Sequence, residues 1–355
     1  MFLSAAALIL QIALNFREWM WNSGKTVAIV AHSGRGYSLG RNGSLSLTDF
    51  GSIWPARFAP HRQVPCVEFS LSEFFSMSYS QLFEHDQQFM RLVRRETDVD
   101  LVTAALEIAR DGQTDLMFEP TRVRLQRSVA RLTHPVTQAG SDVEELKLLV
   151  RYMTEELNLR GDDDCFSEPD ASYLNRVLET GRGIPISLSL VYLNIANELG
   201  IPLEPIAAPS HFLTRLQTDS GNLYVDAFDH GRIMDEAECL EWLHGITELP
   251  VAEIRRSFKP VDERTIMIRM LNNLKALFGN QEMWVSAWRV QCRLSMLIPG
   301  SYRERRDHAI LTLRAGRPGE AMDLLQSCLN VCPADERPVL NQHLTQAKRD
   351  VPNCN

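Results

Sequence analysis

The stretch Gly183-Ile184-Pro185-Ile186-Ser187-Leu188-Ser189 decides how the middle of this chain folds. Pro185 suits the first turn of a helix, because the N–H group that proline lacks would have no partner there. Apolar residues then recur at helical spacing up to Gly200: Leu188, Val191, Tyr192, Ile195 and Leu199. This pattern predicts a helix over 185–199 that buries one face.

Helices precede this segment and strands follow it. Apolar residues recur at three- and four-residue spacing in several runs between about 77 and 157, and again in a short helix over 172–178. After Gly200, two strands are expected, one near Ile206 and 211–216 and one over 222–228, joined by the turn signal Asp219-Ser220-Gly221-Asn222. The sequence therefore predicts an α+β domain in which helices pack with a small antiparallel sheet.

The C-terminal region is expected to be all-α and repetitive. Pro299 and Pro333 lie one tetratricopeptide period apart, as do Ala287 and Ala321. Helices are predicted at 266–278, 283–297, 302–315 and 318–331, with a capping helix at 337–349. Two such units are fewer than the three that a repeat array normally needs. We therefore expect this region, 262–350, to lean on the preceding domain.

Composition limits the function. The formal net charge of −8 argues against general binding to nucleic-acid phosphates, which requires a basic surface. Hydrophobic residues make up 45% of the chain, enough for sizeable buried cores. The seven cysteines include no Cys-x-x-Cys pair, which favours a reducing compartment, the cytoplasm, over a disulfide framework.

Residues 1–76 are rich in Gly, Ser, Arg and Pro and are expected to form a poorly ordered extension, with a strand near 25–30. The glycines of 33–40 resemble a phosphate-binding loop, but no helix start follows them. Met1–Asn15 is apolar but too short to span a bilayer. It also lacks the charged start and cleavage site of a secretory signal. An anchor or a weak signal remains an alternative to a plain extension before a domain start near Met77.

No metal or cofactor is expected. The acidic loop Asp162-Asp163-Asp164 lacks the glycine and closing glutamate of an EF-hand. Cys328 and Cys332 lie one helical turn apart but have no histidine beside them. These patterns favour a solvated loop and core packing.

Several short motifs, taken together, resemble the SirB-type family, a transglutaminase-like domain followed by tetratricopeptide repeats. The motifs are Phe166-Ser167-Glu168-Pro169, Ser172-Tyr173-Leu174-Asn175, Arg182–Ser189, Leu199-Gly200-Ile201-Pro202, Pro209-Ser210-His211-Phe212-Leu213 and Val225-Asp226-Ala227-Phe228. The resemblance covers roughly residues 77–350. It implies a papain- or transglutaminase-like domain over 77–255, including its helical N-terminal part.

The resemblance also implies where a site would lie. Relatives in the wider superfamily use a cysteine at a helix N-terminus, a histidine and an aspartate. His211 would then be the base and Asp226 its orienting partner, while Pro185 occupies the place of the cysteine. The SirB-type subset shares this proline. The resemblance therefore favours a degenerate, non-catalytic domain whose repeats bind a protein or peptide.

The alternative is a hydrolase or acyltransferase acting on an amide or ester, with Ser187 as nucleophile. Ser187 lies two residues past the expected position, about 200° around the helix, and such hydroxyls often bond to backbone instead. Ser189 is a weaker candidate. Cys165 is weaker too, because neighbouring carboxylates would raise its pKa.

Whether His211 meets Asp226 depends on strand register. A two-residue turn at Ser220-Gly221 would place His211 opposite His230, on the order of 13 Å along the strand from Asp226. A four-residue loop, 217–220, would place His211 directly opposite Asp226. The spacing leaves both open, and the resemblance favours the second.

Overall fold

The computed structural model describes residues 28–30, 35–39, 45–49, 79 and 81–351 of the 355-residue chain. The chain divides into two compact units, 1–74 and 75–355. The first contains an antiparallel sheet of three strands, β1 (Ala28–Val30), β2 (Arg35–Leu39) and β3 (Leu45–Asp49). Gly36 pairs with Thr48 within this sheet, so residues 35–39 of the glycine-rich stretch form a strand. Met1–Asn15 and Met77 lie outside the described residues.

The second unit begins with helices, as predicted. They are the short η1 (Gln81–Phe83), then α3 (Gln87–Val93), α4 (Leu101–Ala109), α5 (Glu119–Thr137) and α6 (Asp142–Arg151), which continues into the π-helical turn η2 (Tyr152–Glu156). Side-chain caps explain where two of them start. Asp100 accepts a hydrogen bond from the N–H of Thr103, and Ser141 accepts one from the N–H of Glu144.

The middle of the chain contains the predicted helix and sheet. Its elements are η3 (Asp163–Ser167), η4 (Pro169–Ser172), α7 (Leu174–Thr180), α8 (Pro185–Leu199), β4 (Leu203–Ile206), β5 (Leu213–Thr218), β6 (Gly221–Asp226) and β7 (Arg232–Asp235). Pro185 is the first helical residue of α8, and Gly200 ends it at a left-handed φ of 79°. The predicted helix is confirmed.

The sheet is larger than predicted. Four antiparallel strands lie in the order β4-β5-β6-β7, where the sequence indicated two. Thr218 pairs with Gly221, so the turn consists of Asp219 and Ser220 alone. Both predicted registers were therefore wrong. His211 also lies outside β5, in the turn before it.

The sheet is covered on both faces. α9 (Glu236–Thr247) and α10 (Val251–Arg256) follow β7. On β6, Tyr224 packs in the core that these two helices form, whereas Val225 belongs to the main core that contains α8. This alternation is the two-residue period of a strand buried on both sides.

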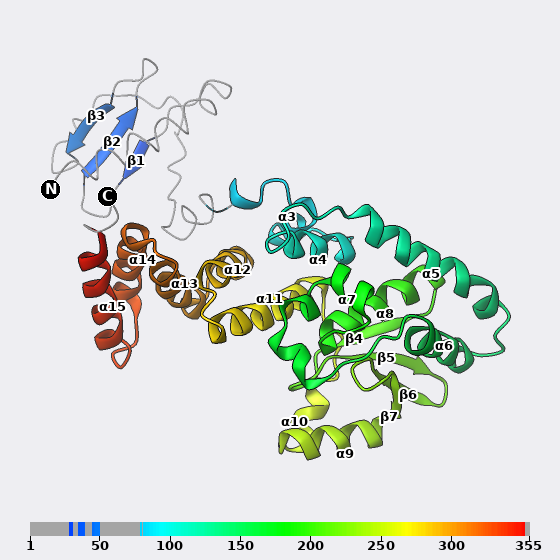
Figure 1. Cartoon of the computed structure of the whole chain (residues 1–355). Coiled ribbons are helices and arrows are strands. Elements are labelled where there is room, and N and C mark those ends of the chain that lie inside the picture. Colours follow the sequence, from blue (N-terminus) through cyan, green and yellow to red (C-terminus); the bar gives the residue numbers. More distant parts are fainter. Residues whose placement is uncertain (1–27, 31–34, 40–44, 50–78, 80, 352–355) are drawn as a thin grey trace, which may run out of the picture. The chain divides into compact units, whose positions relative to one another are not determined.

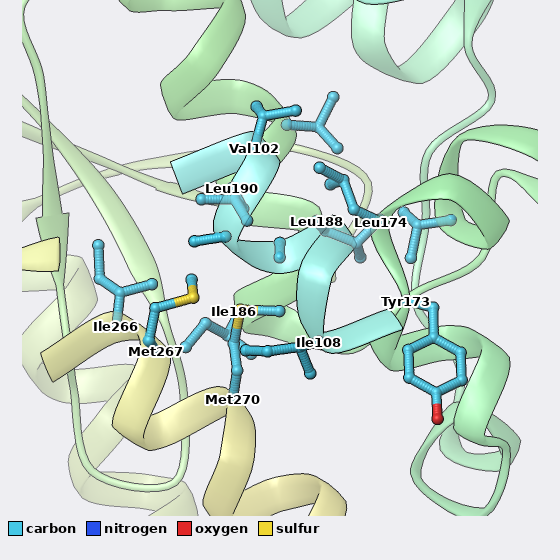
Figure 2. Close-up of a cluster of buried hydrophobic side chains, with 14 of the residues drawn as sticks. Val102, Ile108, Tyr173, Leu174, Ile186, Leu188, Leu190, Ile266, Met267 and Met270 are labelled. Atoms are coloured by element: carbon cyan, nitrogen blue, oxygen red, sulfur yellow. The ribbon is translucent and has the colours of Figure 1, made fainter. Parts of the chain in front are cut away.

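The repeat region has the five predicted helices. They are α11 (Glu263–Asn280), α12 (Trp284–Leu297), α13 (Tyr302–Arg314), α14 (Pro318–Val331) and α15 (Arg337–Asp350), arranged one after another (Figure 1). α11 does not stand apart from the preceding domain. Its residues Ile266, Met267 and Met270 pack in one cluster with Ile186 and Leu188 of α8 (Figure 2). The α+β architecture followed by helical repeats is thus confirmed.

No helix in the described ranges combines the length and the apolar character needed to cross a membrane.

Candidate functional site

The start of α8 offers no nucleophile at its first position. Pro185 is buried there, and the preceding Ile184 provides no side-chain cap. The N–H of Ile184 instead donates to the carbonyl oxygen of Ala171, at 3.1 Å. The residue before α8 is therefore hydrogen-bonded to the backbone of η4, and residue 185 has no ionisable side chain.

The two nearby serines bond to backbone. Ser187 Oγ lies 2.6 Å from the carbonyl oxygen of Ala171 and 3.0 Å from that of Ile184, and the side chain is fully buried. Ser189 Oγ, also buried, lies 3.3 Å from the carbonyl oxygen of Phe212. Among the hydrogen bonds of residues 81–351, neither hydroxyl contacts the His211 ring. Only the contact of Ser187 with Ile184, three residues back, is the local bonding expected of a serine in a first helical turn. The contacts with Ala171 and Phe212 join segments that are distant in the sequence.

His211 and Asp226 meet, although the register that brings them together was not foreseen. His211 Nε2 lies 2.9 Å from Asp226 Oδ1, and the Asp226 side chain is 1% exposed. Asp226 ends β6, while His211 lies two residues before β5 begins. The predicted contact is present, but the turn before β5 makes it, not a pairing across two strands.

Asp226 also anchors the chain that follows it. Its Oδ1 accepts a second hydrogen bond from the N–H of Phe228, at 2.9 Å. Because an ionised carboxylate can only accept, its contact with His211 requires a proton on Nε2. In the neutral imidazole, Nδ1 is then the nitrogen that can accept a proton.

Aromatic rings fix the plane of the imidazole. The ring of Trp242 meets it edge-on at a centroid distance of 4.9 Å, and that of Phe228 does so at 5.8 Å. The imidazole is thus held by a carboxylate and by two rings from different elements. The sequence did not single out Trp242, because its place beside His211 depends on how α9 packs on the sheet.

Cys165 is a poor nucleophile here. Burial raises the pKa of its thiol, and its Sγ lies 3.4 Å from Asp162 Oδ1. Its main obstacle is thus burial, more than the neighbouring carboxylates that the sequence indicated. The acidic loop is held by Arg182, which pairs with Asp162 and with Glu168 and lowers the pKa of Asp162 to about 2.

In the part of the chain that the structure describes, no three His, Cys, Asp or Glu side chains gather as a metal site would require. Cys328 packs in the core of α13–α15, where burial raises the pKa of its thiol to about 11.

Comparison with known proteins gives two family matches. Residues 119–272 match the transglutaminase-like superfamily, and residues 274–343 match the tetratricopeptide repeat. A UPF0162 protein of Xylella fastidiosa is 33% identical over 237 residues, which are 66% of this chain and 84% of the relative. Protein SirB1 of Salmonella typhimurium is 25% identical over 236 residues, 66% of this chain and 86% of that protein.

The chain belongs to the SirB-type family. In the SirB-type architecture, a transglutaminase-like domain is followed by repeats. Here the first match ends at residue 272 and the second begins at residue 274, so the boundary between them lies inside α11. A shorter likeness links the chain to human F-box only protein 21, at 40% identity over 118 residues, 31% of this chain and 18% of that protein. No solved structure matches significantly.

Proposed function

We propose that the transglutaminase-like domain of this protein is non-catalytic and that the chain acts as a protein- or peptide-binding module. The observation that supports the proposal most directly is the N-terminus of α8. Residue 185 is a proline, and the nearest hydroxyl, that of Ser187, is buried against two carbonyl oxygens. Nucleophilic catalysis needs an accessible group within reach of a base, and this arrangement supports neither condition.

Binding is proposed to occur through the repeats, because stacked helical pairs present extended surfaces to peptides. α13 offers one exposed, charged face. Arg303 and Arg314 lie about three turns apart on the same side of this helix, and both are exposed. We place the protein in a reducing cytoplasm, which the five free cysteines of the described residues support.

One alternative has an observation in its favour. The formed pair of His211 and Asp226 is what a hydrolase or acyltransferase needs behind its nucleophile. Ser187 would then attack an amide or ester, with His211 as base. This requires the Ser187 hydroxyl to leave the carbonyl oxygens of Ala171 and Ile184.

A serine-directed fluorophosphonate probe decides between the two. We expect the full-length chain to show only background labelling, unchanged in Ser187→Ala. The matched control is Ser189→Ala, whose hydroxyl is equally buried. Labelling that is lost in Ser187→Ala and kept in Ser189→Ala would establish the enzyme and overturn the proposal.

Affinity capture with the full-length chain tests the binding role. The variant Arg303→Glu/Arg314→Glu changes the exposed face of α13. Arg124→Glu/Arg127→Glu makes the same charge change on exposed positions of α5. Partners held by the wild type and by the α5 variant should be lost from the α13 variant. Equal capture by all three chains would contradict binding at this face of the repeats.

A further inference from the structure

The first helix of the repeat region also reaches the backbone of His211. Arg269 of α11 donates from Nη2 to the carbonyl oxygen of Ala208 at 2.9 Å and to that of His211 at 2.5 Å. Its guanidinium carbon lies 5.6 Å from the centroid of the Phe212 ring. One side chain thus hydrogen-bonds to the residues on both sides of Pro209 and Ser210.

The helix that carries Arg269 is itself held in place. Met267 and Met270, its neighbours on α11, are buried in the main core against α8 (Figure 2). Five residues before Arg269, Arg264 donates from Nη1 to the carbonyl oxygen of Leu92 at 2.6 Å. The part of α11 that carries Arg269 is therefore held in place by core packing and by a hydrogen bond.

His211, in contrast, has little backbone support of its own. The pairing of β5 with β4 begins only at Leu213. The N–H of His211 donates to the carbonyl oxygen of Ala208, at 3.2 Å, which closes a tight turn. Within that turn, Ser210 has a left-handed φ of 56°, a conformation that costs energy for a residue other than glycine. The turn needs an external contact to persist, and Arg269 bonds to both of its ends.

The charge of Arg269 is satisfied by these carbonyl groups. Across residues 79 and 81–351, no carboxylate lies within ion-pairing distance of it, and burial lowers its pKa. A half-buried cation without a counter-ion stays favourable only while its hydrogen bonds are kept. The carbonyl oxygens of Ala208 and His211 therefore compensate the charge of Arg269. The same two hydrogen bonds hold the 208–211 turn in place.

We propose that Arg269 is the positioning residue of the pair formed by His211 and Asp226. It holds the 208–211 turn so that His211 Nε2 meets Asp226. It thereby ties the geometry of this pair to α11, the helix in which the repeats begin. The proposal goes beyond the proposed function, which gives His211 and Asp226 no role, and it does not depend on whether the domain is catalytic.

The test measures His211 directly in the full-length chain. Long-range ¹H–¹⁵N spectra at mildly alkaline pH report which ring nitrogen carries the proton, and exchange measurements report how well Nε2–H is held. His211→Gln assigns the signal. In Arg269→Gln we expect mixed tautomers and exchange faster by about tenfold or more, the factor for one lost hydrogen bond to a charged group.

Two further variants complete the test. Arg264→Gln removes the other backbone-bonded arginine of α11 and should leave the His211 signals unchanged. Arg269→Lys keeps the charge and one carbonyl contact, and should give an intermediate exchange rate even if Arg269→Gln folds poorly. Wild-type tautomer and exchange in the folded Arg269 variants would overturn the proposal, as would equal effects from Arg264→Gln. Neither readout depends on probe labelling or partner capture, so each proposal can fail alone.

Discussion

Asp226 shows how one residue can serve local structure and a site at once. Its Oδ1 accepts from His211 Nε2 and from the N–H of Phe228, and the side chain is almost fully buried. An aspartate that begins a turn commonly bonds to the backbone two residues on. Here that local bond also fixes the carboxylate that the imidazole meets, so the two roles belong together.

Removing the Asp226 carboxylate should therefore destabilise the fold. Asp226→Ala leaves two partly buried donors without a partner and should cost about 2–4 kcal/mol of unfolding free energy. Asp226→Asn keeps an accepting oxygen and should cost clearly less. Urea unfolding monitored by circular dichroism measures both. Equal losses in the two variants would show that the carbonyl-type acceptor does not matter.

His308 is a second buried imidazole, in the repeats. Burial lowers its pKa from 6.5 to about 4. Its Nε2 lies 3.6 Å from Cys292 Sγ, and the ring of Tyr79 meets the imidazole edge-on at a centroid distance of 4.7 Å. Beyond these contacts, Glu320 raises and Arg317 lowers its pKa by smaller amounts. The folded chain thus keeps His308 neutral where the unfolded chain would protonate it.

This difference sets the sign of a pH effect. The stabilisation from neutral His308 is complete above pH 6.5 and is lost as the pH falls from 6.5 towards about 4. Over that window, unfolding free energy should fall by about 1.4 kcal/mol per pH unit because of this residue. His308→Gln should reduce the slope of unfolding free energy against pH in this window, because up to one proton fewer is taken up on unfolding. His85→Gln, at a side chain 87% exposed, should leave it unchanged.

At the scale of elements, close packing of Gly161 against Phe228 positions the aromatic ring that lies next to His211. A Cβ atom on Gly161 would come within 1.9 Å of the Phe228 ring, so only glycine fits there. The N–H of Gly161 also donates to the carbonyl oxygen of Phe228, at 2.9 Å. The segment between η2 and η3 and the turn after β6 are thereby held together beside the site.

Gly161→Ala should displace Phe228 and destabilise the chain by about 1–3 kcal/mol through overpacking. Gly279→Ala is its matched control, because a Cβ atom there, in α11, meets open space. That variant should stabilise the chain by about 0.5–1 kcal/mol, since glycine is unfavourable in a helix. Thermal unfolding compares the two. A neutral Gly161→Ala would contradict the close packing.

At the scale of the whole second unit, one buried core runs from the helices before α5 and from α8 into the repeats. Arg293 of α12, fully buried, pairs with Asp86 before α3 and with Asp111 after α4. Its guanidinium carbon also lies 4.0 Å from the centroid of the Phe83 ring. We propose the boundaries 77–255 and 262–350 as limits of the sequence patterns, with α11 and α12 folding together with the helices before them.

Arg293→Met should therefore destabilise the whole unit, although the residue belongs to the repeats. It leaves two buried carboxylates short of a partner and should cost about 3–5 kcal/mol. Arg303→Met, on the exposed face of α13, should change stability by about 0.5 kcal/mol or less. Urea unfolding followed by tryptophan fluorescence and by circular dichroism should shift together. A shift confined to one signal would contradict a shared core.

Sequence reasoning reached most of the helices and part of the site. The repeat helices and α8 carry long periodic patterns with proline and glycine at their ends, so local signals suffice. β7 was missed, and β4 was predicted only near Ile206 as part of one strand with β5, because four residues are too few for a reliable two-residue period. His211 and Asp226 were found through motifs, whereas Trp242 and Arg269 carry no motif and lie far along the chain.

The sequence by itself determined where α8 begins, that residue 185 carries no nucleophile, and that helical repeats follow an α+β domain. These features depend on neighbours along the chain. Only the tertiary structure decided that Ser187 bonds to Ala171, that the 208–211 turn brings His211 to Asp226, and that Arg269 holds that turn. Hydrogen bonds between distant segments depend on how buried elements pack, and no local pattern encodes that.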